Sequence, residues 1–235
     1  MIRLYLFAEG PTEQTFATDV LRPHLAKFNV YLEKLILIAH AKNKQKVHRG
    51  GVGRSYLPMK NDILRFLAQE KSPEVRFTTM IDLYAIHADF PGMAEASQIS
   101  HIPYQRVELL EKAFAQNIGD HRFIPYIQLY EYEAFLFSDP DKFAGFYDDH
   151  KKEIAALKTI ADSVSSPELI DDGLHTAPSK RIIKLFPDYE GAKRLYGPLI
   201  AEEIGLKKIR DKCHHFNAWL SRLEQLDSIH EPKAG

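Results

Sequence analysis

The sequence predicts an α/β protein with a mostly parallel sheet of about four strands. Short apolar runs typical of buried strands alternate with stretches in which apolar residues recur at helical spacing. A strand, a helix and a second strand follow one another within about the first 40 residues, which is the pattern of a βαβ unit. The chain has 235 residues, 45% hydrophobic and 27% charged, so we expect a packed core rather than disorder.

Four strands are expected in the N-terminal part, at residues 2–8, 35–39, 77–81 and 123–129. Helices are expected among them, from Thr12, around residues 63–67 and over residues 107–118. Pro23 should kink or end the first helix, and Gly119 is well placed to end the third. Pro125 predicts an edge position for the fourth strand, because proline cannot donate a hydrogen bond to a neighbouring strand.

No convincing strand follows Pro140. A short helix is expected over residues 179–186, with Pro178 at its entry, and a longer one over residues 209–223. We therefore predict two parts, an α/β domain at residues 1–140 and a helical C-terminal extension at residues 141–235 that packs on it.

Composition excludes several classes of protein. The formal net charge is −1, so any affinity for nucleic acid must come from a local basic patch. A lone cysteine, Cys213, cannot form an internal disulfide or a cysteine-based zinc cluster, and core packing is favoured over metal binding for Cys213-His214-His215. The opening apolar run is too short for a signal peptide, and no stretch approaches the roughly 18 apolar residues of a membrane span. We expect a cytoplasmic protein without a membrane partner.

Acidic residues stand where the expected strands end. Glu9 follows the first strand, Asp82 the third, and Glu131 and Glu133 the fourth, while Glu13 can point back from the following helix. The carboxyl ends of parallel strands share one edge of a sheet, about 5 to 10 Å apart, so these carboxylates can converge. Oxygen ligands without a cysteine nearby suit Mg²⁺ or Mn²⁺.

Each acid also has a simpler interpretation. An acid after a strand often caps the next helix, which is the favoured reading of Glu13 taken alone. Strand alternation explains the acids of Glu131-Tyr132-Glu133 as well as metal binding does. Asp82 is different, because it lies inside an apolar stretch and needs a partner there. The metal prediction therefore depends on the whole set.

The segment from residue 41 to 55 is basic and contains no acid. Its cations are Lys42, Lys44, Lys46, Arg49 and Arg54. Such a loop can grip the phosphates of a nucleic acid, although a solvated, mobile loop explains the charges equally well. The glycines Gly50, Gly51 and Gly53 do not form a phosphate-binding P-loop, because the Lys-Ser/Thr pair is missing.

These motifs resemble a known family. The stretch Glu9-Gly10-Pro11-Thr12-Glu13 resembles the opening motif of the Toprim domain of topoisomerases and primases, most closely the branch of the OLD (overcoming-lysogenisation-defect) nucleases. Residues 81–84, 130–134 and 177–182 resemble signatures of a Toprim-related bacterial family of unknown function. The similarity runs from the N-terminus to about Leu223.

The resemblance implies a Toprim-like fold and a role for each acid. Glu9 and Glu13 would hold one metal or act partly as general acid and base, and Asp82 with one of Glu131 or Glu133 would hold a second. Lys180 would lie near the scissile phosphate, and Arg181 beside it would join the nucleic-acid contacts. The sequence departs from the Toprim pattern at Tyr84, which stands where a second acid is usual. Asp89 or Glu131 then substitutes for that acid, or one metal binds weakly.

The predicted function is Mg²⁺-dependent hydrolysis of phosphodiester bonds in DNA or RNA, with Mn²⁺ as an alternative metal. The resemblance implies an ATPase partner and a role in defence against phage. The alternative is a non-catalytic subunit that binds metal or phosphate and docks on an ATPase, which the tyrosine at position 84 favours. Primase-like nucleotidyl transfer is disfavoured, because no template-binding or zinc module is visible.

Overall fold

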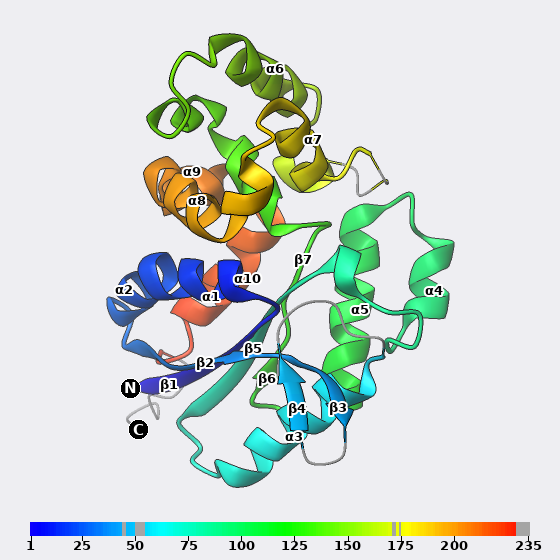
Figure 1. Ribbon diagram of the computed structural model, residues 1–235. Helices are drawn as coiled ribbons and strands as arrows, with labels where there is room; N and C mark the ends of the chain where they lie inside the picture. The colour runs from blue at the N-terminus through cyan, green and yellow to red at the C-terminus, as the bar shows by residue number, and fades with distance from the viewer. Residues whose placement is uncertain (44–45, 50–54, 171–172, 174, 229–235) are drawn as a thin grey trace. The chain divides into compact units, whose positions relative to one another are not determined.

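The computed structural model describes residues 1–43, 46–49, 55–170, 173 and 175–228. It contains a five-stranded sheet in the order β2-β1-β5-β6, with β7 also paired to β5 (Figure 1). The strands are β1 (Ile2–Ala8), β2 (Val30–Leu37), β5 (Val75–Asp82), β6 (Phe123–Ile124) and β7 (Ile127–Gln128). The β1–β2, β1–β5 and β5–β6 pairs are parallel. The predicted α/β class with a mostly parallel sheet is confirmed.

The chain forms two compact units. The first comprises residues 1–81, 85–127 and those from 218 on, and the second comprises residues 82–84 and 128–217. The predicted boundary between residues 140 and 141 lies inside the second unit. The sheet and the helices that cover it belong mainly to the first unit, and the second is built from short helices and 3₁₀ turns.

Apolar runs explain the two central strands. In β1 the side chains of Leu4, Leu6 and Phe7 are fully buried, and every residue of β5 is buried. Strands covered by helices on both faces are expected to be apolar along their whole length. Two polar side chains inside β5 are satisfied there, because Thr78 Oγ1 donates to the carbonyl of Ile124 and Thr79 Oγ1 to that of Tyr126.

The first connection of the sheet is one helical stretch in three parts. It consists of α1 (Pro11–Phe16), a π-helical turn over Ala17–Leu21, and α2 (Arg22–Ala26). Pro23 stands at the beginning of α2, immediately after the π turn. Proline cannot donate a helical hydrogen bond, so the wider turn accommodates it and the predicted irregularity at this position is observed.

The helices that come after β2 and after β5 in the chain lie on the face of the sheet opposite α1 and α2 (Figure 1). They are α3 (Leu57–Gln69) and α5 (Pro103–Ile118), with the short α4 (Met93–Gln98) before α5. Gly119 ends α5 with φ of +73°, in the left-handed region that glycine adopts without strain, as predicted.

The predicted fourth strand is broken at Pro125. Residues on either side form β6 and β7, and β6 lies at the end of the sheet, so the predicted edge position is confirmed. The basic segment also differs from expectation, because its backbone forms a separate antiparallel pair, β3 (Ala39–Asn43) and β4 (Lys46–Arg49). Hydrogen bonds therefore organise residues 39–43 and 46–49, in part of a segment for which the sequence predicted a loop; Gly50, Gly51 and Gly53 fall outside the described residues.

The second unit contains α6 (Lys151–Asp162), α7 (Pro178–Leu185), α8 (Tyr189–Ile204) and α9 (Leu206–Lys212). Helix α10 (His214–Glu224) begins in this unit and ends in the first. The single helix predicted over residues 209–223 was wrong, because Cys213 is extended and separates α9 from α10. The buried carboxylate of Glu168 explains the break, since it accepts the backbone N–H groups of His215 and Phe216 and so caps a new helix.

The middle of α10 is fixed to the sheet by the only tryptophan of the chain. Trp219 Nε1 donates to Thr78 Oγ1 at 2.9 Å, and its indole stacks on Tyr126 with 4.4 Å between ring centroids. Trp219 is buried, so its N–H needs an acceptor inside the protein.

We predict that Trp219→Phe lowers the free energy of unfolding by about 1 to 2 kcal/mol, because the hydrogen bond to Thr78 is lost while a stacked ring remains. Urea denaturation followed by circular dichroism measures this, since the substitution removes the fluorophore. Arg222→Ala, on the exposed side of the same helix, should change stability by less than about 0.5 kcal/mol. Equal effects of the two substitutions would refute the assigned role of the indole.

Candidate functional site

Glu9 and Glu13 lie at the carboxyl end of β1. The backbone N–H of Glu9 donates to the carbonyl of Met80 in β5 at 3.0 Å, which continues the pairing of the two strands by one residue. From β1 the chain passes to β2 on one side, and β5 lies on the other side. The order of strands therefore reverses at β1, and in open parallel sheets ligands bind beyond the strand ends at such a point.

The carboxylate of Glu13 has a defined structural contact. Its Oε2 accepts the backbone N–H of Gly10 at 2.8 Å, and its side chain is buried. A Cβ atom added at Gly10 would lie 3.1 Å from the same oxygen, so a glycine leaves room for this close approach. The cap interpretation of Glu13 is thus observed, and the contact fixes the carboxylate over the turn that also carries Glu9.

In the second unit, Glu133 pairs with a lysine that the sequence analysis missed, and the charges of Glu131 and Asp82 also act on this lysine. Nζ of Lys193 in α8 forms an ion pair with Glu133 Oε1 at 3.0 Å, and Glu133 is fully buried. Burial opposes the charge of Lys193, but attraction to Glu133, Glu131 and Asp82 outweighs it and raises the lysine pKa. The three acids are therefore close enough to share the field of one ammonium group.

Three further contacts fix these acids and the backbone next to them. Glu131 Oε2 accepts the backbone N–H of Ser179, in the first turn of α7, at 2.8 Å. The residue before it, Tyr130, has φ of +62°, which is unusual for a residue other than glycine, and its carbonyl accepts the N–H of Tyr84 at 3.0 Å. Tyr189 donates its hydroxyl to Glu133 Oε1 at 3.5 Å, and burial followed by the charge of Glu133 raises the tyrosine pKa.

The predicted basic residues have mixed positions. Lys180 is exposed on α7, and Arg181 Nε donates to the carbonyl of Thr176 at 2.6 Å. The backbones of Lys42, Lys46 and Arg49 lie in strands β3 and β4, while Lys44 and Arg54 fall outside the described residues. The nucleic-acid role of these residues stays a prediction.

Asp89 was predicted as a possible substitute for the acid that the resemblance places at position 84, where this chain has Tyr84. Both carboxylate oxygens of Asp89 accept the N–H of Tyr56, at 3.1 and 3.0 Å, immediately before α3. This aspartate therefore serves as a helix cap. Tyr84 has 51% of its surface exposed, so the ring at this position is accessible to solvent.

No group of three or more His, Cys, Asp or Glu side chains is placed to hold a metal ion within the described part of the chain. Mg²⁺, however, is commonly held by one or two carboxylates, with water and substrate phosphates completing its coordination. Glu9 and Glu13 supply oxygen donors of the right kind for that arrangement. Cys213 is buried, and burial raises the pKa of its thiol, so core packing explains this residue.

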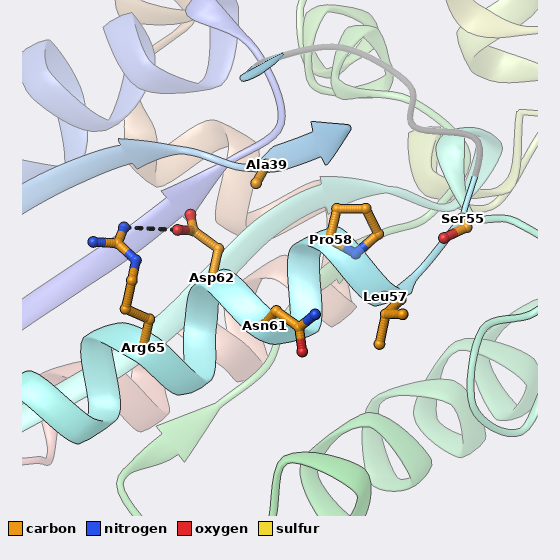
Figure 2. Close-up of a pocket in the computed structure, with 7 residues that line it drawn as sticks. All are labelled: Ala39, Ser55, Leu57, Pro58, Asn61, Asp62 and Arg65. Atoms are coloured by element: carbon orange, nitrogen blue, oxygen red, sulfur yellow. Dashed lines mark hydrogen bonds and ion pairs between the residues drawn. The ribbon is translucent and has the colours of Figure 1, made fainter. Parts of the chain in front are cut away.

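A cavity of about 360 Å³ opens in the first unit, beside the beginning of α3 (Figure 2). The residues that line it are Ala39, Ser55, Leu57, Pro58, Asn61, Asp62 and Arg65. Among these residues the two charged side chains form an ion pair within the helix, with 2.7 Å between Arg65 Nη2 and Asp62 Oδ1. The pair neutralises itself, and this hollow shows no residue set that indicates a reaction.

The profile of one protein family, described as a domain of unknown function (DUF4276), matches residues 8–224. The chain belongs to this family. Comparison with curated proteins and with solved structures found no match. No helix among the described residues is long and apolar enough to cross a membrane. Both acid groups and Lys193 lie within the part of the chain that the DUF4276 profile covers.

We predict that Glu13→Ala lowers the free energy of unfolding by about 1 kcal/mol, because the N–H of Gly10 loses its acceptor. Glu13→Gln should cost clearly less, since the amide oxygen can still accept that hydrogen bond. Asp19→Ala, at an exposed acid of the following turn, is the control and should have little effect. Chemical denaturation measures all three, and an equal loss for Gln and Ala would contradict the cap.

Proposed function

We propose that this chain is a Mg²⁺-dependent nuclease that hydrolyses phosphodiester bonds in DNA or RNA. The observation that carries the proposal is the place of Glu9 and Glu13 at the carboxyl end of β1, where the strand order reverses. Ligands of open parallel sheets bind beyond such strand ends. The resemblance of residues 9–13 to the Toprim opening motif supports the same chemistry.

Glu9 and Glu13 are the proposed metal ligands. Glu9 is partly exposed, which supports the approach of a hydrated ion, whereas the buried Glu13 is oriented by the N–H of Gly10. A bound Mg²⁺ would activate the attacking water and stabilise the negative charge on the leaving oxygen. The contribution of the protein is to hold two oxygen donors on one short turn, so that little reorganisation is needed when the ion and substrate bind.

The strand pair β3 and β4 is the proposed contact for the nucleic-acid backbone. Lys42, Lys46 and Arg49 lie in its strands, in a segment that carries no acid. Contacts of this kind bind phosphate without reading sequence and weaken as salt is added. The resemblance to Toprim proteins also supports an ATPase partner and a role in defence against phage, in the cytoplasm.

A second candidate function is a non-catalytic subunit that binds metal or phosphate beside an ATPase. It is favoured by the contacts of the second-unit acids, because Glu133 pairs with Lys193 and Glu131 caps α7. Acids engaged in this way explain the cluster without catalysis. Isothermal titration that detects Mg²⁺ or Mn²⁺ binding by a protein inert on every polynucleotide would select this function.

We expect the purified protein to cleave plasmid DNA, single-stranded DNA or tRNA in Mg²⁺ or Mn²⁺ but not in EDTA. Glu9→Gln and Glu13→Gln should each slow cleavage roughly 100-fold or more, because a neutral amide is a poor ligand for a hard cation. The matched control is Glu95→Gln, which removes an exposed acid of α4 and should leave the rate unchanged.

Circular dichroism of each variant separates lost chemistry from lost folding. Cleavage by Glu9→Gln and Glu13→Gln at the wild-type rate would refute the proposed metal ligands. Cleavage in EDTA would refute the dependence on a divalent ion.

A further inference from the structure

Two residues of α8, Lys193 and Tyr189, contact the carboxylate of Glu133. Tyr189 and Lys193 are four residues apart in this helix, so their side chains lie on the same face. Both reach the same atom, Oε1 of Glu133, the lysine at 3.0 Å and the tyrosine hydroxyl at 3.5 Å. One turn of α8 therefore presents a cation and a hydroxyl donor to a fully buried carboxylate.

Asp82 and Glu131 lie within the electrostatic reach of the same ammonium group. Carboxylates held near one another in a protein repel, and burial strengthens the repulsion. Such a group folds only if a cation, a proton or hydrogen-bond donors compensate the charge. Here the N–H of Ser179 donates a hydrogen bond to Glu131, and the ammonium of Lys193 forms an ion pair with Glu133.

We propose that Lys193 is the resident cation of the Asp82, Glu131 and Glu133 cluster and takes the place predicted for a second divalent ion. The three acids are then a lysine-held part of the second unit rather than a metal site. This inference deepens the proposed function, because it leaves Glu9 and Glu13 as the metal ligands. It rests on the geometry of the cluster and not on catalysis.

The role assigned to Lys193 has a physical consequence. Lys193 is partly exposed but Glu133 is fully buried, so removing the lysine leaves a buried charge that the protein cannot easily accommodate. When the ammonium is removed, the carboxylate of Glu133 loses its cation, and Mn²⁺ can replace that charge because carboxylate oxygens are ligands that it prefers. A variant without the lysine should therefore gain affinity for the ion that the wild-type cluster does not bind.

The experiment counts Mn²⁺ ions bound per chain, by electron paramagnetic resonance of the free ion, for the wild type and Lys193→Met. We expect the variant to bind one more ion than the wild type and to show a larger rise in Tm when Mn²⁺ is added. Lys193→Arg should behave as the wild type because it keeps the charge. Arg194→Met is the matched control on the exposed side of α8 and should add no ion.

The double variant Lys193→Met with Glu133→Gln should lose the additional ion. An equal number of ions in Lys193→Met and the wild type would overturn the proposal. If Lys193→Met does not fold, the single variant Glu133→Gln still tests the proposal. This single variant should bind as many ions as the wild type, and the loss of one would show that the cluster holds metal beside the lysine.

The proposed nuclease activity is tested separately by Glu9→Gln, which should remove an ion from the wild-type count. If the proposed nuclease activity is absent, the result expected for Lys193→Met is unchanged. Conversely, a metal-binding Glu133 would not alter the rate expected for Glu9→Gln in the cleavage assay. The two proposals can therefore fail independently.

Discussion

The parallel pairing of β1 with β5 is the constraint on which the rest of the structure depends. It sets Ala8 opposite Met80 and lets the N–H of Glu9 extend the ladder, so the first acid stands immediately beyond the last paired residue. A shift of one residue would exchange the side chains of β1 between two buried faces, so the packing on both faces would have to change. The register of these two apolar strands thus fixes the position at which the first acid, Glu9, follows the strand.

Buried carboxylates in this protein act repeatedly as acceptors for backbone N–H groups. Glu13 accepts the N–H of Gly10, and Glu131 accepts that of Ser179. Glu168 accepts the N–H groups of two residues at the beginning of α10. The N-terminal N–H groups of a helix have no partner within the helix, and a carboxylate needs donors when it leaves water. Each contact satisfies both requirements, and those of Glu131 and Glu168 also tie together segments that are far apart in the chain.

The two groups of acids therefore have different surroundings. Glu9 and Glu13 lie on a turn at the end of a central strand, and Glu9 remains partly exposed. Glu133 is fully buried against a lysine and a tyrosine. A metal ion that must exchange water and meet a substrate is better served by the first arrangement. The charge of Lys193 gives the second arrangement a stable state without an ion.

The sequence by itself determined much of the fold, because apolar periodicity reports which residues each segment buries. It indicated the central strands, the end of α5 at Gly119 and the edge position next to Pro125, each of which follows from local chemistry. Tertiary structure decided the break at Cys213 and the partner of Glu133, since Glu168 and Lys193 act across 45 or more positions of the chain. A sequence pattern shows that an acid needs a partner, but only the packing of distant helices selects which donor reaches it.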